Sequence, residues 1–203
     1  MNLMRISQKI ILFIFVFLLI SIGVVFAVAY SIGAPPIYFD EETEFYDQNG
    51  QVIPYHATKE APVDLDEISP YFLQAIILVE DKNFYQHHGF QFKRMIKALW
   101  NNLQAKTLKE GASSITQQLA KNLYLTNEKT WTRKIKEAFY TIRLEMFYTK
   151  EEILRSYLHT IYFGHGAYGI HEASQFFFNK KPADLSLSEA TTLAAIPKGP
   201  TYY

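Results

Sequence analysis

Residues 10–34 include no charged side chain and consist mainly of Ile, Leu, Phe and Val. This run is longer than the roughly 20 residues that a helix needs to cross a bilayer. A cleaved signal peptide is the alternative, because Ala27-Val28-Ala29 resembles a cleavage site, but the apolar core of such a peptide has only about 7 to 15 residues. The sequence therefore predicts an uncleaved transmembrane helix.

The charges on either side of this run predict its orientation. Arg5 and Lys9 precede it, whereas the first charged residue after it is Asp40. Positively charged residues beside a membrane helix favour the cytoplasmic side. We therefore expect residues 1–9 in the cytoplasm, a single crossing of the cytoplasmic membrane, and an extracytoplasmic domain after residue 34.

The 203 residues allow one compact domain besides this anchor. The absence of cysteine excludes disulfides, thiolate metal sites and a cysteine nucleophile. Pro35-Pro36 ends the apolar run, and residues 47–50 are a turn signal between short extended stretches. We expect residues 35–66 to be a linker with short strands and residues 67–203 to form a mainly helical functional domain.

A helix is predicted to begin at Ser69, a suitable N-cap, and Pro70, a suitable first helical residue. Apolar residues cover nearly every face through Val79, which is typical of a core helix. Glu80 and Asp81 follow at the C-terminal end, where the helix dipole disfavours negative charge. Such a carboxylate is a candidate general base.

Two features near this helix also have an ordinary structural interpretation. Taken alone, adjacent carboxylates are more often part of a surface turn, here in contact with Lys82 or Lys93.

The next helix has apolar residues at helical spacing, such as Phe92 and Ile96, and it has Lys93, Arg94 and Lys97 on another face. This basic face could meet anionic lipid headgroups or pyrophosphate, or it could be a solvated surface, which is what the sequence alone favours.

Five residues fit the pattern ED-x-x-F-x-x-H-x-G: Glu80, Asp81, Phe84, His87 and Gly89. This pattern resembles the first signature of the peptidoglycan glycosyltransferases, which polymerise lipid II as stand-alone enzymes or as the first domain of bifunctional penicillin-binding proteins. The resemblance extends over roughly residues 40–203. It implies a mainly α, lysozyme-like helical domain in which Glu80 is the general base.

Residues 111–118, Gly-Ala-Ser-Ser-Ile-Thr-Gln-Gln, resemble the second family signature, G-x-S-T-I-T-Q-Q, with Ser114 in place of Thr. Hydroxyl residues at a helix start leave backbone N–H groups and a positive dipole end for a phosphate. Ser114 and Gln117 also fit a capping box, and both roles are compatible. Lys121 follows on the same helix, and the resemblance implies that it contacts phosphate.

Residues 133–137, Arg-Lys-Ile-Lys-Glu, match the third signature, R-K-x-x-E, on a helix expected over residues 126–148. As an isolated pattern, Arg133 and Glu137 would be an ordinary surface ion pair. Because this motif follows the first two signatures in the family's order, Glu137 resembles the second acid of the family's site, and the basic residues beside it resemble its cationic neighbours. Lys129 stands where many members have Arg, which keeps the charge but loses a bidentate fork.

Residues 150–164 resemble the fourth signature, except that His159 stands where Asn is usual, and residues 185–200 resemble the fifth. Capping boxes are predicted for two helices, at Thr149 with Glu152 and at Ser186 with Glu189.

The glycines of residues 164–169 spell G-x-G-x-x-G. A helix precedes them where a dinucleotide site needs a strand, so we expect a helix end and a turn.

The resemblance implies an inverting glycosyltransferase of the bacterial cytoplasmic membrane that makes β-1,4-linked glycan from lipid II and releases undecaprenyl pyrophosphate. Glu80 and Glu137 are the expected catalytic residues. The expected substrate-binding residues are Asp81, Phe84, His87, Ser113, Thr116, Gln117, Gln118, Lys121, Lys129, Arg133 and Lys134. A divalent cation, Mg²⁺ or Mn²⁺, is a candidate cofactor, and Glu137 would either orient the basic residues or hold that metal.

The expected partners are lipid II, the growing lipid-linked glycan, the membrane, moenomycin-type inhibitors and cell-wall synthesis proteins, with no nucleic acid. Two alternatives remain open. A lysozyme-like hydrolase or lytic enzyme would also place a glutamate beside a sugar, although it needs no basic cluster. A non-catalytic membrane scaffold for cell-wall synthesis would need no acids in these patterns.

Overall fold

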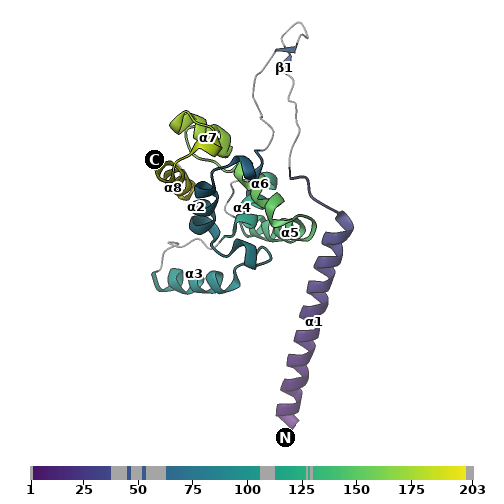
Figure 1. Ribbon diagram of the computed structural model, residues 1–203. Coiled ribbons are helices and arrows are strands. Elements are labelled where there is room, and N and C mark those ends of the chain that lie inside the picture. The colour runs from purple at the N-terminus through teal and green to yellow at the C-terminus, as the bar shows by residue number, and fades with distance from the viewer. Residues whose placement is uncertain are drawn as a thin grey trace.

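The computed structural model describes residues 2–37, 45–46, 52–53, 63–105, 113–126, 128 and 130–199. In these residues the fold is mainly α, as predicted (Figure 1). The α-helices are α1 Asn2–Ile32, α2 Pro70–Asp81, α3 Phe92–Ala105, α4 Ile115–Tyr124, α5 Trp131–Phe147, α6 Lys150–Thr160, α7 Gly169–Phe178 and α8 Leu187–Ala195. Short 3₁₀ helices lie at Leu65–Glu67, Phe84–Gln86, Pro182–Asp184 and Ile196–Lys198.

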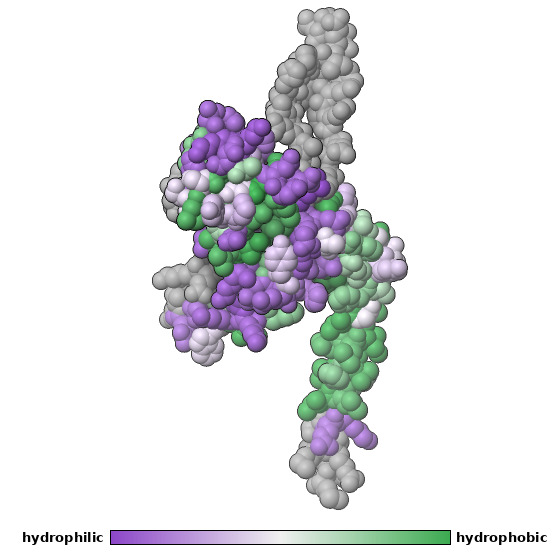
Figure 2. Space-filling model, in the orientation of Figure 1, coloured by the Kyte–Doolittle hydropathy of each residue, from purple (hydrophilic) through white to green (hydrophobic). Residues whose placement is uncertain are grey.

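Helix α1 is a long apolar rod that extends away from the other helices (Figure 2). Its segment Gln8–Ile32 contains an 18-residue stretch with a mean hydropathy of 3.2 and is long and apolar enough to cross a membrane. It ends at Ile32, before the expected residue 34, because Gly33 adopts a left-handed φ of 83° and two prolines follow.

The chain leaving α1 is held against the folded body through its backbone carbonyls. Arg143 Nη2 donates to the Gly33 oxygen at 2.7 Å, and the Tyr148 hydroxyl donates to the Pro35 oxygen at 2.6 Å. The ring of Tyr30, near the end of α1, stacks on a ring of α5. The anchor is therefore joined directly to α5.

Two short strands, β1 Phe45–Tyr46 and β2 Val52–Ile53, pair antiparallel with Phe45 opposite Ile53. They follow the expectation of short strands in this region. The turn expected at residues 47–50 lies outside the described residues.

The core lies where α2, α4, α6 and α8 meet. Helix α2 packs on α8, and α4 contacts both α5 and α6. Large side chains from each of these helices are fully or almost fully buried, among them Phe72, Ile76, Leu119, Tyr157 and Leu193. Helix α3 lies beneath this body in Figure 1.

The prediction that α2 is buried on nearly every face was wrong. Phe72 and Ile76 are fully buried, whereas Tyr71 is exposed and Leu78 is 68% exposed. The packing partner α8 covers one side of the helix only. The buried side ends in Glu80 and Asp81, which places both carboxylates inside the protein.

Local signals predicted the starts of several helices correctly. Capping boxes begin α4 at Ser114, α6 at Thr149 and α8 at Ser186. Helix α5 begins at Trp131, later than the expected residue 126, because the Thr130 hydroxyl caps it.

Ser69 occupies the N-cap of α2 without capping through its side chain. Its hydroxyl donates instead to the Leu185 oxygen at 2.9 Å, which ties α2 to the segment before α8.

The glycine-rich segment after α6 is a turn, as predicted. Gly164, Gly166 and Gly169 have φ values between 77° and 86°. A Cβ at Gly169 would lie 2.6 Å from the His159 oxygen, so this position requires glycine.

Candidate active site

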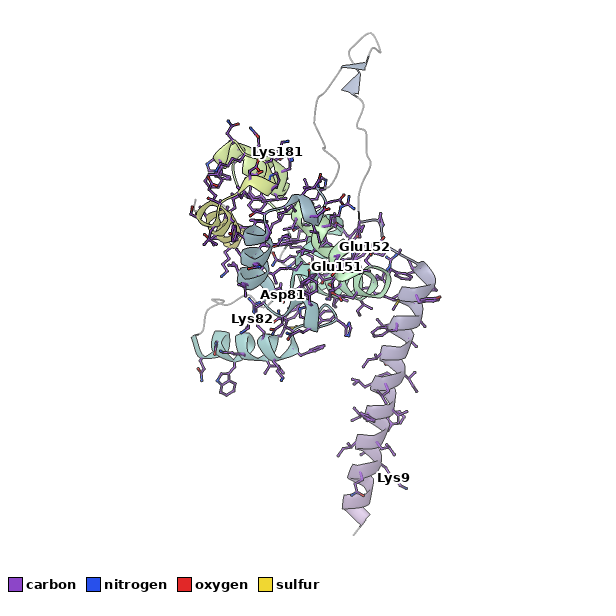
Figure 3. All side chains as sticks on the ribbon, viewed as in Figure 1. Lys9, Asp81, Lys82, Glu151, Glu152 and Lys181 are labelled. Atoms are coloured by element: carbon purple, nitrogen blue, oxygen red, sulfur yellow. The ribbon has the colours of Figure 1, made fainter. Side chains whose placement is uncertain are left out.

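A cleft of about 1290 Å³ opens beside the C-terminal end of α2. Figure 3 labels Asp81 and Lys82 at this end of the helix, above α3. Among the described residues, the wall of the cleft contains two carboxylates, Glu80 and Glu137. It also contains six Lys or Arg side chains: Lys82, Lys93, Arg94, Lys97, Lys121 and Lys198. A cleft of this size and charge is suited to a large anionic ligand.

Glu80 is the last-turn carboxylate of α2 that faces this cleft, and it is 8% exposed. Its Oε2 accepts a hydrogen bond from Gln118 Nε2 at 2.8 Å. Its Oε1 is buried and has no hydrogen-bond partner among the residues that the structure describes. A buried carboxylate oxygen without a donor is costly, and it keeps an unused capacity to accept a hydrogen bond or a proton.

Asp81 points away from the cleft and is fully buried. It accepts hydrogen bonds from His87 Nε2 at 3.0 Å, from the Gln91 amide, and from the backbone N–H of Ile115 at 3.0 Å. The last of these donors opens α4, where the helix dipole favours a negative charge. Asp81 therefore joins α2, the following loop and α4, and neither acid belongs to an exposed turn.

His87 connects this buried network with the cleft that it lines. Because the Asp81 carboxylate can only accept, Nε2 carries the hydrogen of that bond. The other ring nitrogen, Nδ1, is buried without a partner among the described residues.

Phe84 is fully buried, and the ammonium nitrogen of Lys150 lies over its ring, 4.6 Å from the ring centre.

Helix α4 presents part of its first turns to the cleft. Gln117 and Gln118 line it, and Ser113 lies just before the helix. Lys121 lines it too, and its ammonium has no ion pair with the residues that the structure describes. Thr116 points the other way, because it is fully buried and its hydroxyl donates to Glu145 Oε1.

Glu137 on α5 is 2% exposed and is surrounded by donors. Arg133 Nη1 donates to its Oε2 at 2.9 Å, while Lys134 Nζ and Gln117 Nε2 both approach its Oε1. The interpretation of Arg133 and Glu137 as an ordinary surface pair was wrong, because the carboxylate is buried. Lys134 Nζ also lies 3.4 Å from the Ser113 hydroxyl.

Some of the expected site residues meet at the cleft and others lie behind it. Those that line the cleft are Glu80, His87, Ser113, Gln117, Gln118, Lys121 and Glu137. Those buried behind it are Asp81, Phe84 and Thr116. Arg133 and Lys134 contact Glu137, and Lys129 lies outside the described residues.

Five basic residues of this cleft were not among the expected site residues: Lys82, Lys93, Arg94, Lys97 and Lys198. On α3, Lys93 and Lys97 are exposed, as expected of a solvated face, and they also line the cleft together with Arg94. Helical periodicity identified the basic face of this helix, but it could not show that the face borders the cleft. Lys198, in the short helix after α8, also lines the cleft, and only its place in the fifth signature could have indicated it.

The described residues do not fit a metal ion held by the protein. They contain no group of three or more His, Cys, Asp or Glu side chains that could hold one. Both oxygens of Glu137 already accept from nitrogen donors, and the two cations among these would repel a further cation.

Residues 43–203 match a family model described as transglycosylase. The chain is 49% identical over 173 residues to penicillin-binding protein 2D of Bacillus subtilis (strain 168). The matched region covers 84% of the chain and 25% of that relative. It is 43% identical over 183 residues to penicillin-binding protein 1F of the same organism, covering 90% and 26%. For penicillin-binding protein 1A of Escherichia coli (strain K12) the identity is 42% over 161 residues, covering 79% and 19%. The chain thus spans about a quarter of the length of each of the first two relatives, and less than a quarter of the length of the third.

Proposed function

The chain belongs to the transglycosylase family, whose helical fold is lysozyme-like, and from this we propose that it is a peptidoglycan glycosyltransferase. It would polymerise lipid II into β-1,4-linked glycan and release undecaprenyl pyrophosphate. Residues 67–203 would be the glycosyltransferase domain. The observation that carries this proposal is the unpaired, buried Oε1 of Glu80 in the wall of a strongly basic cleft.

Glu80 would act as the general base. The 4-hydroxyl of the acceptor sugar would lie against Oε1, which takes the proton as the hydroxyl oxygen attacks the anomeric carbon of the donor. The bond between that carbon and the pyrophosphate oxygen breaks, and the electron pair leaves with the pyrophosphate. One displacement of an α-linked pyrophosphate yields a β bond.

The basic side chains of the cleft would stabilise the leaving pyrophosphate. Lys121 is the strongest candidate, because its ammonium lines the cleft without an ion-pair partner among the described residues. Arg94, Lys97 and Lys198 line the same cleft. Cations that are already in place stabilise the developing charge without reorganisation.

Glu137 would position this cationic wall and not touch the attacking sugar. Its two oxygens hold Arg133 and Lys134, and Gln117 adds a third donor. A buried carboxylate fixes such side chains more firmly than solvent would. Mg²⁺ or Mn²⁺ would enter this proposal only with the substrate's phosphates as ligands.

A membrane location suits a lipid-linked substrate. Phe92, Ile96 and Trp100 form an exposed apolar stripe on α3, and Phe92 also lines the cleft, together with Lys93, Arg94 and Lys97 of the same helix. Such an amphipathic helix favours a membrane surface. We propose that α1 crosses the bacterial cytoplasmic membrane once, with the N-terminus in the cytoplasm and the domain outside.

A hydrolase is the rival function. It would need a second carboxylate with an oxygen available for a water or a sugar. Glu137 offers none among the described contacts, because nitrogen donors hold both of its oxygens. A scaffold for cell-wall synthesis proteins would need no unpaired carboxylate oxygen in a cleft.

Incubation of the purified chain with lipid II distinguishes the three functions. We expect glycan polymer, and competition for the donor site by a moenomycin-type inhibitor. Degradation of preformed glycan without polymer would indicate the hydrolase. Neither reaction would favour the scaffold.

A further inference from the structure

The side chain of Gln118 joins Glu80 to a tyrosine outside the cleft. Its Nε2 donates to Glu80 Oε2 at 2.8 Å, and its Oε1 accepts from the Tyr157 hydroxyl at 3.4 Å. The three residues come from α2, α4 and α6. The second contact is longer than a usual O–H···O bond, so it is a weak hydrogen bond.

An amide beside a carboxylate can be placed in two ways that have almost the same shape. With its NH₂ toward Glu80 it donates a hydrogen bond, whereas with its oxygen toward Glu80 it would repel the carboxylate. A donor on the far side of the amide favours the first arrangement. Tyr157 supplies that donor.

The surroundings keep Tyr157 a donor. Its side chain is fully buried, at 0% exposure, in the core between the helices. Burial, together with the nearby charges of Glu80 and Asp81, raises the pKa of the Tyr157 phenol well above its ordinary value. The hydroxyl therefore keeps its proton at neutral pH.

We propose that Tyr157 is a positioning residue for the reaction: through Gln118 it holds one oxygen of Glu80, so that the unpaired Oε1 keeps its place at the cleft. This inference rests on the proposed function, because it takes Glu80 as the base. Tyr157 does not line the cleft, so it acts without touching the substrate.

The test compares Tyr157→Phe with Tyr148→Phe in the full chain, with lipid II as substrate. Both changes remove one phenol hydroxyl that donates a hydrogen bond and keep the ring, but Tyr148 bonds to Pro35 near the anchor. For Tyr157→Phe we expect kcat to fall by about tenfold or more, with KM nearly unchanged. For Tyr148→Phe we expect kcat of the parent.

The rate profile against pH separates positioning from loss of packing. Without an oriented amide, the ionised form of Glu80 loses a donor, so the acidic limb of the profile should move to higher pH in Tyr157→Phe. An unchanged limb, or equal losses of kcat in Tyr157→Phe and Tyr148→Phe, would overturn the proposal.

Gln118→Met supplies a second variant in case Tyr157→Phe does not fold. It should show the same shift of the acidic limb. The double variant, Tyr157→Phe with Gln118→Met, should have the same kcat as Gln118→Met alone, because both changes break the same connection to Glu80. No limb shift in Gln118→Met, or additive losses in the double variant, would contradict the inference. A parent chain that makes no polymer would instead refute the proposed function.

Discussion

Arg94 Nη1 lies 2.9 Å from the backbone oxygen of Glu80, which joins α3 to the end of the helix that carries the proposed base. The contact turns the basic face of α3 toward the cleft. The apolar face of the same helix is left exposed, with Trp100 at 63% exposure. One helix thus contacts the proposed catalytic residue on one side and is available to lipid on the other.

The exposed stripe of α3 predicts contact with the membrane. The chain has two tryptophans, Trp100 and Trp131. In Trp131→Phe, the fluorescence of Trp100 should be quenched by brominated lipids in vesicles, because Phe92, Ile96 and Trp100 form one exposed apolar face. Quenching by acrylamide in water, with no effect of the brominated lipids, would show that this face is turned to solvent.

Lys121→Ala should weaken both substrate binding and turnover. In the proposed reaction the ammonium would face a group that is charged at the start and gains charge as the bond breaks, so we expect a loss of about 10²–10³-fold in kcat/KM. Lys136→Ala is the matched control, since Lys136 is exposed and does not line the cleft. Equal, small effects of the two changes on polymerisation and on inhibitor affinity would remove Lys121 from the pyrophosphate site.

Glu137→Gln should slow the chemical step and also destabilise the fold. The change leaves Arg133 and Lys134 without their buried counter-charge, which should lower the free energy of unfolding by about 2 kcal/mol. We expect kcat to fall more than KM changes, because the carboxylate positions cations and does not bind the acceptor. Thermal unfolding and single-turnover kinetics measure the two effects separately. A variant with the stability and kcat of the parent would contradict both the stabilising and the positioning role of Glu137.

The capping box of α8 predicts a pH-dependent contribution to stability. Hydrogen bonds from Lys180 and Ser186 lower the pKa of Glu189 from its ordinary value of 4.5 to about 2. Because folding favours the ionised form, the contribution is complete above pH 4.5 and is lost as the pH falls toward 2. Glu189→Gln should therefore lower the Tm at neutral pH, with a difference from the parent that shrinks through this window.

Lys180→Met tests the assigned cause. It should reproduce much of the loss at neutral pH, since Lys180 Nζ lies 2.8 Å from Glu189 Oε1. A Tm difference for Glu189→Gln that stays constant between neutral and acidic pH would contradict this assignment.

Features that depend on a few neighbouring residues could be predicted from the sequence. The capping boxes at Ser114, Thr149 and Ser186 each need only residues three positions apart. The long apolar helix and the glycine turn after α6 have equally local causes. The family signatures identified Glu80 and Glu137 as candidates before any geometry was known.

Features that depend on distant partners could not be predicted. Ser69 bonds to Leu185 instead of capping α2, and nothing near Ser69 in the sequence indicates that partner. Asp81 and Thr116 lie within signatures but point into the body, because the signatures combine residues that line the cleft with residues that support it. The direction of the basic face of α3 depends in the same way on how the helix packs.

The most direct test of the central claim is polymerisation of lipid II by Glu80→Gln. Glutamine keeps the size of the side chain and an oxygen for Gln118 Nε2, but it cannot take a proton from the acceptor. We predict that turnover falls at least about a hundredfold while inhibitor affinity and Tm stay close to those of the parent. Near-normal turnover of this variant would contradict the assignment of Glu80 as the general base.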